Sequence, residues 1–279
     1  MPNNITFTGD LGKPATTLIE KVSDAIGGIA KPWQIKRVAS AEAKAEIIHA
    51  EARIKIGDLE RRAIERMVQE EARKQENIEN ITYKAAEKIS NNSDPGNLDN
   101  DWITYFFDHC RSVSDGDMQD LWSRILAAES EHSGSYSRQT IDLLSKIDKN
   151  DAQLMQALFN FSFSGIVYVK EANDPIYQSK GLNFSKICDL ESLGIIQFNS
   201  LSGYKLNQKD RVINIIYFNN VIQITLKDDP PTLKVGQVLL TRTGKELIGL
   251  TEKHFDVEFM NYFMQSFADS GLNPTSASN

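Results

Sequence analysis

Residues 101–127, DWITYFFDHCRSVSDGDMQDLWSRILA, combine a heavy aromatic load with helical spacing. Apolar side chains recur at intervals of three or four, as from Trp102 to Phe106 and from Trp122 to Ile125, which is the period of an α-helix. Large aromatic residues at such positions belong to a core more often than to a ligand site. The stretch therefore predicts a compact helical block, and we assign it to a helical hub domain over residues 98–155.

A long helical arm is predicted over residues 33–90, before a polar linker that ends at Asn97. From Trp33 to Lys88 the chain has no proline and one glycine, and good helix formers dominate. A narrow apolar stripe recurs along it at about 3.6 residues, the helical period. Because such a helix buries little area by itself, we expect it to self-associate or to dock on another surface. The stripe consists of Ile35, Val38, Ala45, Ile48, Ala52, Ile56, Leu59, Ala63 and Met67.

Residues 1–32 are predicted to form an amino-terminal segment with one short amphipathic helix, and Pro14 suits its first turn. Over residues 14–37, an aliphatic face followed by a tryptophan and cations also suits a helix that lies on a membrane surface. So short a helix more often buries its face in its own protein, so membrane contact is the alternative. The candidate membrane face consists of Leu18, Val22, Ile26, Ile29, Trp33, Lys36 and Arg37.

Residues 156–270 are predicted to form a smaller α+β part with a winged-helix-like order, and residues 271–279 a disordered tail. A helix over 184–192 precedes Gly194 and several β-branched runs, and a further helix opens near Gly244. Acidic residues are interleaved with the basic ones, so we favour a protein-contact wing over a DNA-reading wing. If DNA is bound, the expected phosphate contacts are Lys180, Lys186, Lys205, Lys209 and Arg211.

The composition is that of an ordinary globular protein, because 41% of the 279 residues are hydrophobic and 25% are charged. A net charge of −7 argues against a chain that coats nucleic acid nonspecifically. The two cysteines are not arranged as a disulfide framework and fit a reducing compartment. Neither a signal peptide nor a membrane-spanning apolar run is apparent, so a cytoplasmic location is expected.

Motifs for catalysis, cofactors and metals are missing from the sequence. The four histidines share no ligand spacing, and no phosphate-binding glycine loop or serine nucleophile elbow occurs. Cys110 fits a buried helix position better than a reactive thiolate. The acidic residues around His109 are best explained as helix caps, with Asp99 or Asn100 at one helix and Ser114 at the next. We therefore predict no catalytic residue, no metal site and no cofactor.

Several short motifs occur together between residues 75 and 138. They are Gln75 to Ile81, Asp101-Trp102, Phe106 to Asp108, Cys110-Arg111, Val113 to Asp115, Met118 to Trp122, Arg124 to Ala127 and Gly134 to Arg138. Together they resemble a bacterial family catalogued as domain of unknown function 2806, and pieces of residues 27–43 are similar to its amino-terminal arm. The resemblance covers residues 14–155 well and the remainder weakly, and it implies no particular activity.

The predicted fold class is mainly α with a smaller α+β carboxy-terminal part: a long helical arm, a helical hub and a winged-helix-like end. In layout this is also similar to abortive-infection proteins of the alpha type, which implies phage defence or a stress response. The expected function is that of a non-enzymatic interaction protein, a homo-oligomer with an unidentified protein partner. The alternatives are a DNA-binding regulator and a membrane-surface effector.

Overall fold

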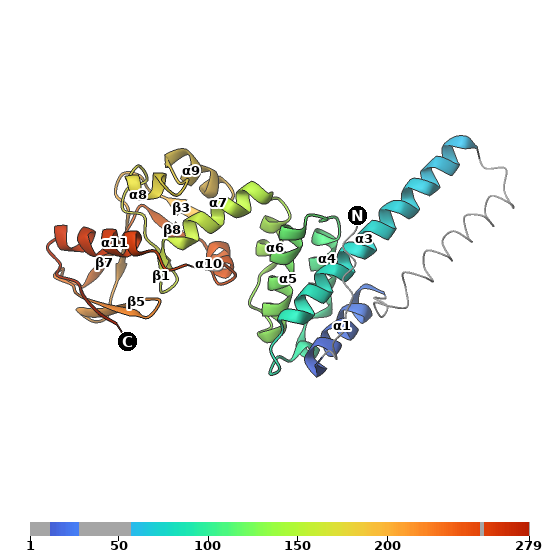
Figure 1. Ribbon diagram of the computed structural model, residues 1–279, viewed down its shortest axis with the longest axis horizontal. Helices are drawn as coiled ribbons and strands as arrows, with labels where there is room; N and C mark the ends of the chain where they lie inside the picture. Colours follow the sequence, from blue (N-terminus) through green and yellow to red (C-terminus); the bar gives the residue numbers. More distant parts are fainter. Residues whose placement is uncertain (1–11, 28–56, 252–253, 279) are drawn as a thin grey trace. The chain divides into compact units, whose positions relative to one another are not determined.

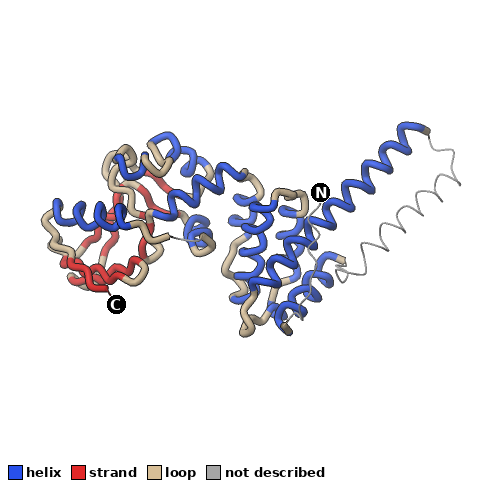
Figure 2. The backbone as a smooth tube through the Cα atoms, viewed as in Figure 1, coloured by secondary structure: helices blue, strands red, loops and turns tan. Residues whose placement is uncertain are grey.

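The computed structural model describes residues 12–27, 57–251 and 254–278, which form two compact units, Met1–Ser145 and Lys146–Asn279. Within the described part of the chain, all of the strands belong to the second unit and the first is helical (Figure 2). A mainly helical chain with a smaller α+β part is therefore confirmed. The hub was predicted to end at residue 155, but unit 1 ends at Ser145, because the helix that follows Asp148 packs within the second unit.

Unit 1 packs shorter helices beside the carboxy-terminal half of a long helix, α3 (Figure 1). Its elements are α1 (Lys13–Ile26), α3 (Asp58–Lys88), the short 3-10 helix η1 (Pro95–Asn97), α4 (Asn100–Cys110), α5 (Gly116–Glu131) and α6 (Arg138–Leu144). The α1 helix contacts both α3 and α4, so it belongs to the hub and is not a separate segment. It ends at Gly27, whose positive φ of 83° favours glycine.

The α3 helix begins at Asp58, which corrects the prediction of one continuous helix from residue 33 to residue 88. Gly57 is extended and its amide donates to the Glu60 carboxylate at 3.0 Å. Asp58 and Glu60 place negative charge in the first turn, where the helix dipole favours it. The remaining arm residues 33–56 lie outside the described residues.

The core of unit 1 is aromatic, as the sequence of residues 101–127 predicts. Trp122 is fully buried, and its ring meets the edge of Phe106 at 5.2 Å. Trp102 stacks on Phe106 at 5.1 Å, and its Nε1 donates to the Tyr136 carbonyl at 2.9 Å. Both tryptophans are therefore confirmed as core residues and not as a ligand box.

Unit 2 surrounds a cluster of edge-to-face aromatic rings with short helices and small antiparallel sheets. Its helices are α7 (Lys149–Asn160), α8 (Pro175–Gln178), α9 (Phe184–Ser192), α10 (Arg242–Ile248) and α11 (Val257–Asp269). Its strands are β1 (Ser162–Phe163), β2 (Ile166–Val167), β3 (Ile196–Phe198), β4 (Tyr204–Asn207), β5 (Val212–Tyr217), β6 (Asn220–Thr225), β7 (Thr232–Gly236), β8 (Val238–Leu240) and β9 (Thr275–Ser278).

Pairing in these sheets is β1–β2, β3–β8, β4–β7 and β5–β6–β9. The strand β9 corrects the predicted disordered tail, because residues 275–278 pair with β6 from Gln223 to Asn220. The β3–β8 pair continues from α9, and the glycine that ends this helix, Gly194, was predicted from the sequence. At the next predicted glycine, Gly244, a Cβ atom would lie 2.1 Å from the Ile195 carbonyl oxygen, so α10 can approach this strand only with glycine there.

Candidate functional site

The amino-terminal half of α3, residues 58–76, is the most exposed helical surface of unit 1, and we call it the projecting half of α3. The first buried residue of α3 is Asn77. The part of α3 that precedes Asn77 extends beyond the other helices of unit 1 (Figure 1). Of the predicted stripe, Leu59 and Met67 are 72% and 56% exposed, and Ala63 is exposed too. The other stripe residues, Ile35, Val38, Ala45, Ile48, Ala52 and Ile56, lie outside the described residues.

Ion pairs along the helix surround these apolar positions. Arg61 pairs with Asp58 at 2.6 Å and with Glu65 at 3.1 Å, and Lys74 pairs with Glu70 at 2.9 Å. Pairs three or four residues apart support a solvated helix only weakly. They favour the helical form of the projecting half, yet leave its apolar residues in water.

The predicted membrane face is corrected where the structure describes it. Leu18 and Val22 are fully buried in unit 1, and Ile26 is half-buried, because α1 turns this face toward α3 and α4. Leu18 and Val22 are therefore not available to lipid. The other candidates, Ile29, Trp33, Lys36 and Arg37, lie outside the described residues. Among the described helices, none has both the length and the apolar character needed to cross a membrane.

The motif residues of the hub form buried polar contacts. The Asn77 amide nitrogen donates to the Arg111 carbonyl at 2.9 Å and to the Ser114 hydroxyl at 3.1 Å, while its oxygen accepts from Gln119 at 3.1 Å. Gln119 also donates to the Val113 carbonyl at 3.0 Å. Buried polar groups need such partners, so these residues fix the turn between α4 and α5 against α3.

Among the acidic residues near His109, Asp99 and Asp115 cap helices, whereas Asp108 and Asp120 form ion pairs with basic side chains. Asp99 accepts from the Trp102 amide at 2.7 Å, which confirms the predicted cap of α4. At α5 the cap is Asp115, which accepts from the Asp117 and Met118 amides at 3.0 Å, and the prediction of Ser114 was wrong. Across the described ranges, His, Cys, Asp and Glu form no group of three or more suited to a metal ion.

Cys110 is confirmed as a buried structural cysteine. Its side chain is inaccessible, and burial raises the pKa of the thiol well above its ordinary value. A thiol held protonated in this way is a poor nucleophile.

Three of the five predicted DNA contacts in unit 2 already face carboxylates. Lys180 lies 3.2 Å from Asp256, and Lys186 lies 3.3 Å from Asp189. The Arg211 guanidinium lies 3.3 Å from the Asp229 carboxylate, and it also donates to the Asp228 carbonyl at 3.2 Å.

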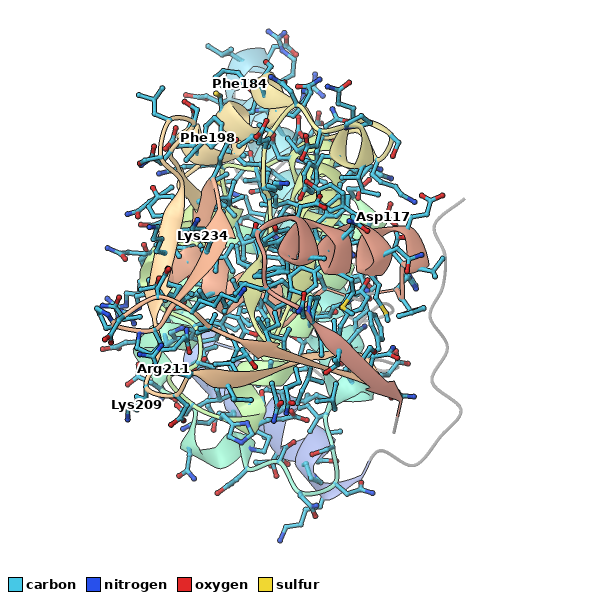
Figure 3. All side chains as sticks on the ribbon, turned by 90° about the vertical axis from the view of Figure 1, so that its left-hand side faces the viewer. Asp117, Phe184, Phe198, Lys209, Arg211 and Lys234 are labelled. Atoms are coloured by element: carbon cyan, nitrogen blue, oxygen red, sulfur yellow. The ribbon has the colours of Figure 1, made fainter. Side chains whose placement is uncertain are left out.

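The five basic residues do not form one stripe. Lys209 and Arg211 lie at the opposite end of unit 2 from Phe184, the first residue of α9 (Figure 3). Lys205 is on β4 and lines a cavity. DNA binding through one continuous basic face is therefore not supported by their placement.

Exposed apolar side chains on the α9 side of unit 2 were missed by sequence reasoning. Phe184 is 45% exposed and meets Phe198 of β3 edge-on at 5.3 Å, and the two rings lie together in Figure 3. Leu201, in the loop after β3, is 97% exposed. The sequence feature that could have indicated this surface is Phe184, an aromatic residue at the first position of a predicted helix, where its side chain need not be buried.

The comparisons with known proteins give a family and no closer relative. The model of the family described as "Protein of unknown function (DUF2806)" matches residues 61–264, from the projecting half of α3 into α11. No curated protein and no solved structure matches the chain. The match includes parts of both compact units, and the buried contacts of Asn77 and Gln119 lie within it. The chain therefore belongs to the DUF2806 family of proteins of unknown function.

Proposed function

We propose that the chain is a non-enzymatic interaction protein that self-associates through the projecting half of α3 and presents unit 2 to a protein partner. The exposure of Leu59 and Met67 carries the first part of the proposal. Both lie on one face, because they are eight residues apart, a little over two turns at about 3.6 residues per turn. A second copy of the helix would remove this face from water.

The second part of the proposal assigns a winged-helix-like role to unit 2. Support comes from α7, α8 and α9, which are followed by the antiparallel pair β3–β8. Along the chain, β1 and β2 lie between α7 and α8, and β4 to β7 lie between β3 and β8. On the third helix, the exposed positions include Lys186 but also Asp189 and Glu191. This mixture of basic and acidic side chains favours contact with a protein surface over contact with DNA phosphates, so a DNA-binding regulator is the second candidate.

Exposed apolar side chains also favour a protein partner over DNA. Phe184, Phe198 and Leu201 come from α9, β3 and the loop after it, and aromatic anchors of this kind are enriched at protein interfaces. The likeness in layout to abortive-infection proteins of the alpha type rests on architecture alone, and phage defence is proposed on that basis as the process served.

The self-association is tested by comparing Ala63→Glu with Ala72→Glu. The two alanines are both exposed on α3, and nine residues place them about two and a half turns apart, on opposite faces. Both substitutions add the same charge to the same helix. We expect mass photometry and light scattering to report an oligomer for the wild type and for Ala72→Glu.

For Ala63→Glu, we expect the dissociation constant of the oligomer to rise at least about tenfold, because the new carboxylate is desolvated in the interface. Equal effects of the two substitutions would show that the stripe is not the interface. A wild type that stays monomeric at high micromolar concentration would remove the self-association proposal.

A further inference from the structure

Unit 2 contains a cavity of about 320 Å³ between β4, β7 and α11, with a recess of about 90 Å³ beside it. The two share Tyr168, Lys234, Ser266 and Ser270 in their walls. Their combined size reaches the lower end of the range of small-molecule sites, about 300–1,000 Å³. The larger cavity also takes in Lys170 and Lys205.

Strand pairing brings the lysines of this cavity together. Lys205 of β4 and Lys234 of β7 are direct cross-strand partners in the antiparallel register. Both side chains are exposed, and like charges placed opposite each other destabilise a strand pair. Gly236 pairs with Tyr204 across a register shift and lies close to Val169, where a Cβ atom would lie 2.0 Å from the Val169 carbonyl oxygen. The pairing of β4 with β7 keeps the two lysines opposite each other.

Within the described chain, carboxylates do not pair with these lysines. No ion pair within 4.0 Å among the described residues includes Lys170, Lys205 or Lys234, whereas Lys180, Lys186 and Arg211 each have an acidic partner. The acidic side chains in the walls are Glu171 and, in the recess, Asp228. Asp228 accepts from the Thr232 hydroxyl at 2.6 Å, and this bond with the nearby lysines lowers its pKa.

Hydroxyl groups complete the walls. Burial raises the pKa of the Tyr168 phenol to about 12, further above neutral pH than its ordinary value. It lies 2.6 Å from the Ser266 hydroxyl, and Ser270 donates to the Ser266 carbonyl at 2.9 Å. The Ser270 proton and one proton of the Tyr168–Ser266 pair are therefore already engaged, and the lysine ammonium groups that line the same cavity are its main hydrogen-bond donors. Phosphate oxygens accept hydrogen bonds from ammonium groups.

We propose that this cavity binds a soluble small molecule that carries two or more adjacent phosphate groups. Three lysines match the multiple charges of a diphosphate or triphosphate better than those of a single carboxylate. A nucleic-acid backbone requires an extended basic stripe, which the separation of Lys209 and Arg211 from α9 does not provide. The site is independent of the projecting half of α3 and extends beyond the interaction role proposed above.

The test is calorimetric titration of the full-length chain with pyrophosphate. Lys205→Gln and Lys234→Gln remove one cavity charge each, and Lys209→Gln is the matched control, because Lys209 is also exposed but does not line the cavity. We expect one pyrophosphate per chain, affinity about tenfold weaker in each cavity variant, and no change in the control. Orthophosphate should bind more weakly than pyrophosphate.

Further arms identify the source of the phosphates. ATP that binds more tightly than pyrophosphate would support a nucleotide ligand, and equal affinity would support recognition of the phosphates alone. Melting temperatures without ligand should not fall in Lys205→Gln or Lys234→Gln, because each removes a like-charge repulsion. The fold of the variants is thereby checked separately from their binding.

Three results would overturn the proposal. They are no saturable pyrophosphate binding at millimolar concentration, equal weakening by Lys209→Gln, and a single-stranded oligonucleotide that binds more tightly than pyrophosphate and loses affinity in Lys205→Gln and Lys234→Gln. The last result would assign the lysines to a nucleic-acid backbone instead.

Discussion

Trp122 is fully buried in unit 1, and its indole Nε1 has no hydrogen-bond partner in the described part of the chain. We expect Trp122→Ala to lower the free energy of unfolding by about 3–5 kcal/mol, because it leaves a large cavity beside Phe106. Trp122→Phe should cost less, since it keeps most of the ring and removes the unpaired donor. Hydrogen exchange of α4 and α5 measures both effects. Unchanged exchange in Trp122→Ala would show that this ring is not part of the core.

At single residues, the sequence predicted burial and helix capping well where only one side chain could fill the role. The burial of Cys110 and the cap at Asp99 were both predicted. The cap of α5 was assigned to Ser114, one residue too early, because serine and aspartate are both good caps. The choice is made by a residue far along the chain, since Asn77 donates to the Ser114 hydroxyl and leaves Asp115 to cap the helix. A local pattern does not contain that information.

Among the helices, the end of α3 is tied to α5 by charge. Lys88 and Arg124 each lie 2.8 Å from the Asp120 carboxylate. Burial raises the pKa of Asp120, but hydrogen bonds and charge from Lys88 and Arg124 outweigh it, so the pKa lies below its ordinary value. Because the folded pKa is the lower one, the stabilisation is present above the unfolded value and disappears as pH falls through the folded value.

We therefore expect Asp120→Asn to destabilise unit 1 at pH 7 and to cost less stability at about pH 3, because the contribution of the charge declines as pH falls below the ordinary value of about 4 toward the lower folded pKa. Thermal unfolding followed by circular dichroism at both pH values measures this difference. An equal loss of stability at pH 7 and pH 3 would mean that the substituted amide fits poorly for steric reasons and that the lost charge of Asp120 is not the cause.

For the strands, the sequence predicted the runs with apolar or β-branched residues and missed those with polar ones. β5 and β6 lie among the β-branched runs that the sequence predicted after Gly194. β4 and β7 were missed because lysines occupy their outward positions, and β9 because Thr275 to Ser278 has no apolar alternation. β4 and β7 pair with each other, whereas β9 forms because β6 offers an open edge.

The strand β9 provides a test of that explanation. It pairs with β6, so its removal leaves the amides and carbonyls of that edge without strand partners. We expect deletion of residues 275–279 to speed hydrogen exchange between Asn220 and Gln223 and to promote aggregation through the open edge. A deletion that changes neither exchange nor solubility would show that β9 does not protect β6.

On the scale of the whole molecule, each compact unit has its own core, and this arrangement was only partly visible in the sequence. The linker at residues 90–97 has the expected polar composition, yet it lies inside unit 1, where Pro95 and Leu98 are buried. The boundary between the units follows α6, where no glycine- or proline-rich segment marks it. The polar composition of residues 90–97 therefore marks a turn within unit 1, and the sequence does not mark the boundary between the two units after Ser145.

Residues 146–279 should fold without unit 1. The aromatic cluster of unit 2 is formed within this range: Phe161 meets Phe259 at 5.1 Å, and Phe263 meets Phe163 at 4.5 Å and Phe267 at 4.7 Å. The length is that of an ordinary domain, about 50–200 residues. We expect the fragment to melt cooperatively and its aromatic-cluster amides to exchange as slowly as in the full chain. An unfolded or molten fragment would mean that this core needs unit 1 for its stability, despite the contacts being complete within unit 2.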